Sequence, residues 1–414
     1  MREMKDSGLP WIGIIPKHWE CIRGKYILNY LSKPVKEDDG VITCFRDGQV
    51  TLRSNRREDG FTMADKEIGY QGIDVGDLVV HGMDGFAGAI GISDSRGKAS
   101  PVLNVLETEQ NKRFIMYYLR SMAYGDVFVA MATGIRVRSC DLRWNKLANF
   151  EYLVPPIDEQ EKIVTFLDIK CSEIDALIAD IQAQIETLEQ YKRSTIAEAV
   201  TKGLNSKVEL KNSTLEWIGT VPVHWEIKPN KYLMKKLKRI QPIYDGEDII
   251  SLTVNGVIKR DLDNPSGKMP TSFDGYQFVY PGNLLMCLFD IDVTPRCIGL
   301  IKDFGLTSPA YSQFVLNNGV DASYYYYYYL NLDFNKELLH LAKNQRHSLN
   351  EEQFGAIKTV VPPFEEQKEI AKYLDEKCVE IDSCISAKKE QISTLEAYKK
   401  SIIFEYVTGK KEVV

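Results

Sequence analysis

The chain repeats one order of motifs twice, and this internal duplication limits the folds open to it more than any other feature. WIGIIPKHWE at residues 11–20 returns 206 residues later as WIGTVPVHWE at 217–226, with both tryptophans, the proline and the histidine kept. LVPPIDEQEKIVTFLD at 153–168 returns at 360–375 as VVPPFEEQKEIAKYLD, and TLEQYKRSTI at 187–196 returns at 394–403 as TLEAYKKSII. Two copies of about 200 residues predict a duplicated domain pair and not a solenoid of short repeats.

A long amphipathic helix is predicted at the end of each copy. Apolar residues of the first copy alternate at spacings of three and four, the heptad pattern of a coiled coil, at Val164, Leu167, Cys171, Ile174, Ile178, Ile181, Ile185 and Leu188. Asp158 and Glu161, directly after two prolines, have the spacing of a capping box, and Gly203 is a candidate stop. About 40 residues of helix would be roughly 60 Å long. The second copy keeps Ala371, Leu374, Cys378, Ile381, Ile385, Ile392 and Leu395 on this seam but has Lys388 where the first has Ile181.

A helix of this length needs a partner for its apolar stripe, because isolated helices are only marginally stable. The narrow seam favours pairing of the two helices with each other as an antiparallel coiled coil, which would give the molecule a pseudo-two-fold repeat and hold the globular parts at opposite ends. Packing of each helix on its own domain is the alternative that stays open.

The blocks between the motifs predict mixed α/β (α+β) domains that share one fold. GDLVVHGM and GNLLMCLFD have the length and bounding residues of strands, and Gly76 and Gly282 hold equivalent places before them. The tyrosine-rich SYYYYYYLNL at 323–332 corresponds to FIMYYLRSM at 114–122, and both predict a buried helix. We therefore expect a first domain at 1–156, a helix at 157–203, a linker and second domain at 204–363, and a helix at 364–410.

Composition places the chain among ordinary globular proteins. Its 414 residues are 44% hydrophobic and 27% charged, which predicts two to three domains and excludes global disorder. No apolar run is long enough to span a bilayer, and the opening MREMKDSGLPW lacks the apolar core of a signal peptide, so a cytoplasmic protein without membrane contact is expected. The eight cysteines form no CxxC pair, which predicts free, mostly buried thiols and no metal site.

The net charge of −6 is unevenly distributed. Residues 157–203 hold five Lys or Arg against ten Asp or Glu, residues 10–150 hold 19 against 17, and residues 216–360 hold 15 against 16. Because the acidity is concentrated in the first long helix, the domains could still present basic loops, and net charge alone neither supports nor forbids nucleic-acid binding.

With WIG-x-[IV]P-x-HWE opening each half and VPP-x-x-EQ-x-x-I leading into each long helix, the chain strongly resembles the specificity subunit of type I restriction-modification systems along essentially its whole length. The resemblance implies that residues of about 20–150 and 227–360 are target recognition domains, each reading one half of a split double-stranded DNA sequence. It implies that the helices set the spacing and dock two methyltransferase subunits, which bring S-adenosylmethionine and methylate adenine. Two restriction (motor-nuclease) subunits would join the same core, and no cofactor is expected on this chain.

Candidate base-reading residues lie in three segments of each block. Major-groove reading uses Arg or Lys for guanine and Asn or Gln for adenine, whereas phosphate contacts need only positive charge or N–H groups. The first block offers Arg46, Gln49, Arg53, Asn55, Arg56, Arg57, His81, Arg96, Lys98, Arg136, Arg138 and Arg143. The second offers Asn255, Lys259, Arg260, Lys268, Arg296, Gln345, Arg346 and His347. Trp11, Trp19, Trp217 and Trp225, with Pro16 and Pro222 between them, are interpreted as structural anchors of the repeated motif.

Catalysis by this chain is not indicated. No GxxxxGK[ST] motif is present, and DNPSG at 263–267 departs from the Asn-Pro-Pro-aromatic signature of amino-methyltransferases at its last two residues. We therefore predict a non-catalytic targeting subunit. The competing interpretation is a duplicated protein-binding scaffold that makes no contact with DNA.

Overall fold

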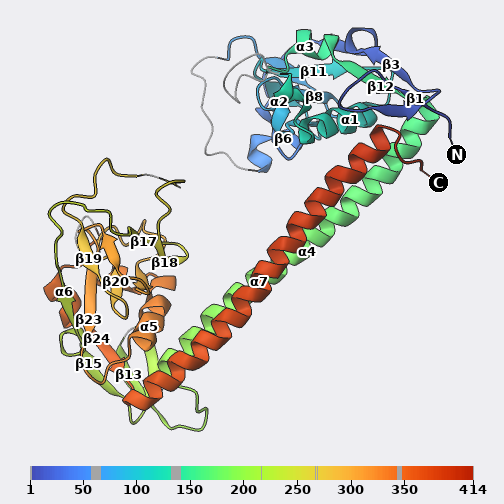
Figure 1. Cartoon of the computed structure of the whole chain (residues 1–414). Helices are drawn as coiled ribbons and strands as arrows, with labels where there is room; N and C mark the ends of the chain where they lie inside the picture. The colour runs from blue at the N-terminus through green and yellow to red at the C-terminus, as the bar shows by residue number, and fades with distance from the viewer. Residues whose placement is uncertain are drawn as a thin grey trace. The chain divides into compact units, whose positions relative to one another are not determined.

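The computed structural model describes residues 2–56, 67–131, 141–215, 217–265, 267, 269–342 and 347–413. The chain divides into two compact units: unit 1 comprises residues 1–181 and 389–414, and unit 2 comprises residues 182–388. Each unit contains one globular domain and one part of each of two long helices (Figure 1). None of the helices in the described ranges has the length and apolar character that a membrane span requires.

The elements of the first domain follow one another closely. The strands are β1 (Met4–Asp6), β2 (Ile14–Pro16), β3 (Glu20–Arg23), β4 (Asn29–Leu31), β5 (Ile42–Cys44), β6 (Val50–Leu52), β7 (Gln71–Ile73), β8 (Leu78–His81), β9 (Ile90–Ile92), β10 (Gly97–Ala99), β11 (Leu103–Glu107) and β12 (Glu151–Val154). The helices are α1 (Lys112–Tyr124), α2 (Val127–Ala130) and α3 (Trp144–Asn149), with 3₁₀ turns η1 (Gly24–Tyr26), η2 (Arg53–Asn55) and η3 (Gly85–Ala87).

The second domain repeats this order. Its strands are β13 (Leu210–Leu215), β14 (Ile218–Pro222), β15 (Glu226–Pro229), β16 (Met234–Leu237), β17 (Ile250–Thr253), β18 (Gly256–Lys259), β19 (Gln277–Val279), β20 (Leu284–Met286), β21 (Ile298–Leu300), β22 (Gly305–Thr307), β23 (Ser312–Leu316) and β24 (Lys358–Val361). Its helices are α5 (Ala322–Phe334) and α6 (Glu351–Ala356), with 3₁₀ turns η5 (Asn230–Tyr232) and η6 (Glu337–Leu341).

A four-stranded antiparallel sheet lies at the centre of both domains. Its strand order is β4-β11-β8-β9 in the first and β16-β23-β20-β21 in the second, so the two sheets are equivalent strand by strand. The strands predicted in GDLVVHGM and GNLLMCLFD are β8 and β20, which occupy the same place. Gly76 and Gly282, just before them, have φ values of 86° and 83°, a conformation that favours glycine. The mixed α+β fold predicted for both blocks is confirmed.

One helix packs on each central sheet, as predicted for the tyrosine-rich segments. α1 contacts β9 and α5 contacts β21. Four hydroxyls of α5 donate hydrogen bonds, among them Tyr325 to the Val360 carbonyl at 3.0 Å and Tyr329 to Asn230 Oδ1 at 2.6 Å, whereas the buried Tyr328 hydroxyl has no partner among the described residues. These bonds explain how a run of six tyrosines can form the core of a domain, because each hydrogen bond offsets the cost of burying a polar group.

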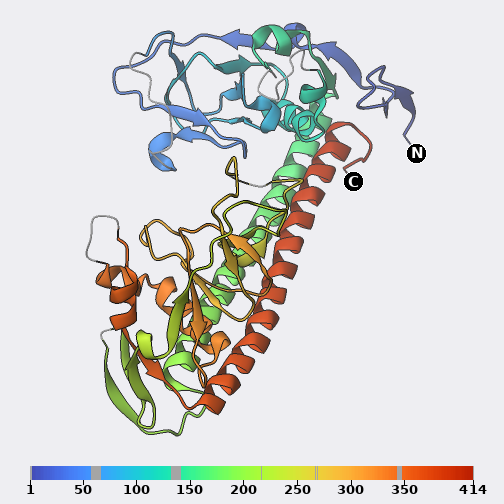
Figure 2. The same cartoon turned by 60° about the vertical axis from the view of Figure 1, so that its left-hand side comes forward.

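The two long helices are α4 (Ile157–Lys202, 46 residues) and α7 (Phe364–Val407, 44 residues). They run side by side within each unit (Figure 1, Figure 2). Lys399 lies 2.6 Å from Asp175 in unit 1, and Lys192 lies 2.6 Å from Asp382 in unit 2, so the register is antiparallel as predicted. Both helices end at glycines with positive φ, Gly203 (74°) and Gly409 (68°).

Residues on the seam face away from solvent. Leu167, Ile174, Ile185, Leu374, Ile381 and Ile385 are buried, and Ile178, Ile181, Leu188, Ile392 and Leu395 are half-buried. The ends of the helices continue into the domain cores. Ile163, Val164 and Leu167 of α4 share the first core with Ile402, Ile403 and Val407 of α7, and the second core combines Ile196, Ala199 and Val200 of α4 with Ile370, Ala371 and Leu374 of α7. The helices therefore pair with each other along the seam and also anchor a domain where each begins and ends.

Candidate functional site

A buried tryptophan joins the repeated opening motif to the start of the long helix in unit 1. Trp19 is fully buried, and its Nε1 donates to Glu159 Oε2 at 2.9 Å. His18 Nε2 lies 2.6 Å from the other oxygen of the same carboxylate, and the Arg2 guanidinium approaches it to 3.7 Å. One glutamate in the first turn of α4 therefore binds both side chains of the His-Trp pair. We call this arrangement the glutamate clamp.

Unit 2 contains the same clamp. Trp225 is fully buried and donates to Glu366 Oε2 at 3.1 Å, and His224 Nε2 lies 2.9 Å from the same oxygen. Glycines close both clamps: a Cβ at Gly203 would lie 2.8 Å from Glu366 Oε1, and a Cβ at Gly409 would lie 2.4 Å from Pro16. The end of one helix thus packs against the clamp formed at the start of the other.

The glutamine after each clamp residue links the helix to the domain. Gln160 Oε1 accepts a hydrogen bond from the backbone N–H of Asn111, the N-cap of α1, at 3.0 Å. Gln367 Oε1 accepts from Asp321, the N-cap of α5, at 2.8 Å. The repeated EQ of VPP-x-x-EQ thereby has a structural role in both copies, since Glu binds the opening motif and Gln fixes the helix that packs on the sheet. Sequence reasoning treated the tryptophans as anchors but did not find their partners, which are about 140 residues away.

The first candidate segment presents cations at the surface. Arg46 is exposed and pairs with Asp84 at 2.7 Å, and Arg56 pairs with Asp47 at 2.7 Å while its guanidinium lies 4.2 Å from the Phe45 ring centre. The same segment holds Gln49, which accepts from Arg56, Asn55, which donates to Thr51, and Arg53, which donates to Thr43. Arg46, Gln49, Asn55 and Arg56 are exposed, so the structure brings them together on one accessible face between β5 and η2.

Arg96 is held inside the first domain. Its Nε and Nη2 donate to the two oxygens of Asp39 at 3.0 and 2.8 Å, and its Nη1 donates to Asp74 at 2.6 Å. Hydrogen bonding to Arg96 lowers the pKa of Asp39 to about 2, and hydrogen bonds from Lys33 and then Arg96 lower the pKa of Asp74 to about 2. This network ties the segment after β4 to β7 and β10, which is a structural use of the charge.

The other candidates of this glycine-rich segment are also engaged. Lys98 pairs with Glu67 at 2.7 Å. His81 Nδ1 accepts from the backbone N–H of Asp84 at 2.9 Å, and burial lowers the pKa of this imidazole. Arg143 is exposed at the start of α3, with Asp141 at 3.6 Å. Arg57, Arg136 and Arg138 lie outside the described residues.

In the second domain the candidates divide in the same way. Arg296 is half-buried and donates to the carbonyls of Ile298 and Val254 at 3.1 and 3.0 Å, whereas Lys259 is exposed and pairs with Asp248 at 2.6 Å. Asn255 is exposed in the turn between β17 and β18, Arg260 follows β18, and His347 has a φ of 44°. Lys268, Gln345 and Arg346 lie outside the described residues.

A further basic stretch escaped the sequence reasoning. KYLMKKLKR at 231–239 contains five exposed cations, in η5, in β16 and directly after β16: Lys231, Lys235, Lys236, Lys238 and Arg239. Five cations within nine residues are a recognisable signal for a surface that contacts phosphates. None of these cations has glycine or proline as a direct neighbour in sequence, whereas most of the other candidates come from segments that contain glycine or proline.

Residues 301–397 match the family model of the type I restriction modification DNA specificity domain. The chain is 26% identical over 425 residues to the type I restriction enzyme MjaVIII specificity subunit of Methanocaldococcus jannaschii, which covers 96% of this chain and 94% of that relative. It is 25% identical over 330 residues to the putative MjaX specificity subunit of the same organism, covering 75% of this chain and 72% of the relative.

By these matches the chain is similar to the specificity subunits of type I restriction-modification systems. A chain solved in work on the complex assembly and conformational transition of the type I R-M system has the same fold, with a TM-score of 0.69 at 12% identity, covering 96% of this chain and 99% of that one. The duplicated clamp, sheet and helix build the two domains of this chain.

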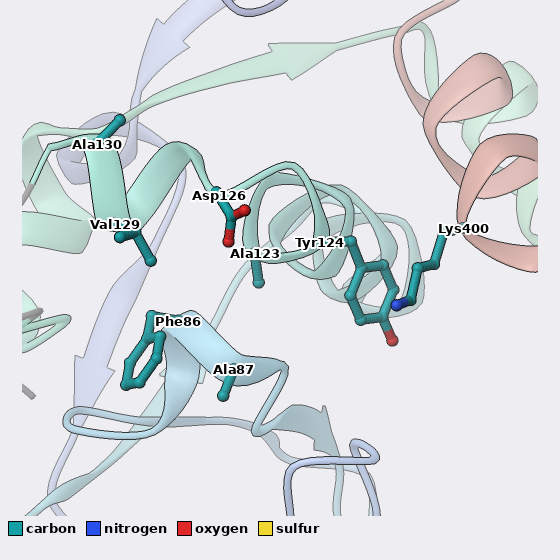
Figure 3. Close-up of a pocket in the computed structure, with 8 residues that line it drawn as sticks. All are labelled: Phe86, Ala87, Ala123, Tyr124, Asp126, Val129, Ala130 and Lys400. Atoms are coloured by element: carbon teal, nitrogen blue, oxygen red, sulfur yellow. The ribbon is translucent and has the colours of Figure 1, made fainter. Parts of the chain in front are cut away.

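The chain has an open hollow in unit 1 (Figure 3). It has a volume of about 660 Å³ and is lined by Phe86, Ala87, Ala123, Tyr124, Asp126, Val129, Ala130 and Lys400. Lys400 comes from α7 and places its ammonium 5.4 Å from the Tyr124 ring centre. In unit 2 Arg193 of α4 lies 5.1 Å from the ring of Phe334, which ends α5 as Tyr124 ends α1. This cation–aromatic contact is a second joint between helix pair and domain.

Among the described residues no cluster of three or more His, Cys, Asp or Glu side chains could hold a metal ion.

Proposed function

We propose that the chain is the non-catalytic, DNA-binding specificity subunit of a type I restriction-modification complex. The domains at 1–156 and 204–363 each read one half of a split double-stranded target, and the paired helices at 157–203 and 364–410 set the spacing and dock two methyltransferase subunits. Those subunits carry S-adenosylmethionine and the adenine chemistry, and two restriction (motor-nuclease) subunits join the complex.

The duplication of one scaffold around different loops carries the proposal. The strand order, the clamp and the glutamine link are the same in both units. The segments that follow β5 and β17 differ in sequence: CFRDGQVTLRSNRRE stands in the first domain and VNGVIKRDLDNPSG in the second. A split DNA sequence with two different halves requires two different reading surfaces on one constant frame. The base contacts of each surface determine which sequence is bound, whereas the frame holds the two surfaces in position on the DNA.

The exposed candidates are the ones we propose to contact DNA. They are Arg46, Gln49, Asn55, Arg56 and Arg143 in the first domain and Asn255 and Lys259 in the second. Arg53, His81, Lys98, Arg260 and His347 stand beside them as secondary candidates. Arg96 and Arg296 are proposed to shape the reading loops from within, since their hydrogen bonds are to groups of their own domain.

A binding selection tests the proposal. The subunit in complex with its methyltransferase partner is incubated with a pool of random duplexes at moderate salt, and the retained molecules are sequenced. Two short conserved blocks at a fixed distance are expected. If the protein complex is intact but no sequence is enriched above the random pool, the result would favour a protein-binding scaffold that makes no contact with DNA. Exchange of residues 20–150 for the block of another specificity subunit should change one of the two blocks and leave the other.

A further inference from the structure

The two long helices have identical residues at equivalent positions, and contacts within the chain account for only some of these identities. At most identical positions an internal partner explains the identity: Asp175 and Asp382 pair with lysines of the facing helix, and Leu167 and Leu374 are buried on the seam. Many exposed positions have diverged instead. Ala183 corresponds to Glu390, Glu186 to Ser393 and Gln190 to Ala397. Exposed positions that are identical in both copies therefore need a separate explanation.

A run of exposed identical residues follows one face of each helix. Thr187, Tyr191, Ser194 and Glu198 are spaced by four, three and four residues, so they form a single stripe on α4. The same letters recur on α7 as Thr394, Tyr398, Ser401 and Glu405, of which Glu405 is half-buried and pairs with Lys411. We call each set a tyrosine stripe; the first lies in unit 2 and the second in unit 1.

The tyrosine is the prominent member of each stripe. Tyr191 is 53% exposed and Tyr398 is 54% exposed. Neither hydroxyl forms a hydrogen bond within the described part of the chain. The hydroxyl therefore adds no hydrogen bond to the described part of the fold, yet the side chain is placed twice in the same surroundings.

Those surroundings include the same ion pair from the facing helix. Lys170 Nζ lies 2.8 Å from Glu173 in unit 1, and Lys377 Nζ lies 2.7 Å from Glu380 in unit 2. Hydrogen bonding to its glutamate raises the pKa of each lysine, with Tyr398 among the groups acting on Lys170 and Tyr191 among those acting on Lys377. Each stripe thus has a Tyr-Lys-Glu face built from both helices.

Charge indicates what kind of molecule covers this face. Residues 157–203 carry five Lys or Arg against ten Asp or Glu, and residues 364–407 carry seven against ten. An acidic helix pair repels the phosphate backbone of DNA, and exposed tyrosine surrounded by polar groups is typical of protein interfaces, where the ring buries a large area at low entropic cost. Two identical faces on one chain call for two copies of the same partner.

We propose that the two tyrosine stripes dock two identical copies of one partner protein, each through an apolar cleft with a basic rim that receives the tyrosine ring. The inference rests on the proposed function, in which that partner is the methyltransferase subunit. It assigns the docking to this one face of the helix pair.

The test uses the full chain co-expressed with its methyltransferase partner. Tyr191→Ala and Tyr398→Ala are made singly and together, and each complex is weighed by native mass spectrometry and titrated by calorimetry. The unaltered chain should bind two partner subunits, each single variant should bind one tightly, and the double variant should lose at least about tenfold in affinity at both sites.

Tyr26→Ala with Tyr232→Ala is the matched control, because these tyrosines are also duplicated and exposed (72% and 61%) but lie on the domains, in η1 and η5. This control should keep two partners at full affinity, and all variants should keep the unfolding midpoint of the parent. Full affinity of the folded double variant would overturn the tyrosine stripes while leaving the proposed function standing. No complex with the unaltered chain would overturn the docking in the proposed function itself, and this inference with it.

Discussion

At the scale of single residues, one glutamate at the start of each long helix holds a domain to that helix. Glu159 accepts from the buried Trp19 indole and lies against His18, and Glu366 does the same for Trp225 and His224. A tryptophan N–H that loses its acceptor in a buried site costs free energy, because neither water nor another group replaces the bond.

Glu159→Ala should therefore lower the free energy of unfolding by about 1–3 kcal/mol without changing which DNA sequence is preferred. Urea denaturation followed by fluorescence measures the first, and the binding selection measures the second. Glu161→Ala, an exposed glutamate in the next turn of the same helix, is the control and should be neutral. A stable Glu159→Ala variant with altered sequence preference would make the clamp part of the reading surface.

Charged residues of similar appearance in the sequence have different roles in the structure. Arg46 and Arg56 are at the surface, so the variant with both changed to alanine should bind DNA more weakly and reduce the slope of log K against log salt by about 1.8, if each cation neutralises one phosphate. Filter binding between low and moderate salt measures the slope. Folded Arg96→Ala protein should keep the slope of the unaltered protein. An equal loss of slope in both variants would contradict the distinction between surface arginines that contact DNA and an arginine that pairs within its domain.

Arg96 should instead make the first domain sensitive to acid. Since the pKa of Asp39 and of Asp74 is about 2 in the fold and that of an unfolded aspartate is about 3.9, their stabilising contribution is complete above pH 4 and is lost as the pH falls through 2. In Arg96→Met the part of this contribution that Arg96 supplies is already absent at neutral pH, whereas the part that Lys33 supplies to Asp74 remains, so stability should be lower at pH 7 and fall less between pH 4 and pH 2.5. Urea midpoints at these pH values measure the difference. Parallel profiles for the two proteins would show that the network does not stabilise the domain.

At the scale of elements, periodicity made the long helices predictable, and local geometry made their ends predictable. The heptad spacing identified the seam, and both helices end within two residues of a glycine. The tyrosine-rich segments were recognised as buried helices because their equivalents in the other copy occupy the same place. Short strands of three or four residues and their pairing order could not be read in this way, since the partner strands are distant in sequence.

The seam also contains one predicted irregularity. Lys388 stands where the other copy has an isoleucine, and it is half-buried with its ammonium near Gln184. Lys388→Ile should raise the free energy of unfolding by about 1 kcal/mol by completing the apolar stripe. Chemical denaturation followed by circular dichroism tests this. Lys389→Ile, on the exposed side, should bring no gain, and a gain of the same size there would indicate a general effect of charge removal.

At the scale of the whole molecule, duplication is what made the organisation accessible from sequence. The offsets of 206 and 207 residues align the two halves, the clamp and the glutamine link recur at these offsets, and the central sheet recurs in the same strand order. The candidate reading surface was accessible only in part. Arg96 and Asp39 are 57 residues apart, and no local pattern distinguishes an arginine that pairs within its domain from one that is free to meet DNA.

The central claim is that two domains on one frame read two halves of one target. The most direct measurement is a map of adenine methylation across the genome of a host that expresses this chain with its methyltransferase subunit. A single motif made of two short, different halves at a constant gap is the expected result. Methylation at one uninterrupted sequence, or at halves separated by variable gaps, would contradict the claim.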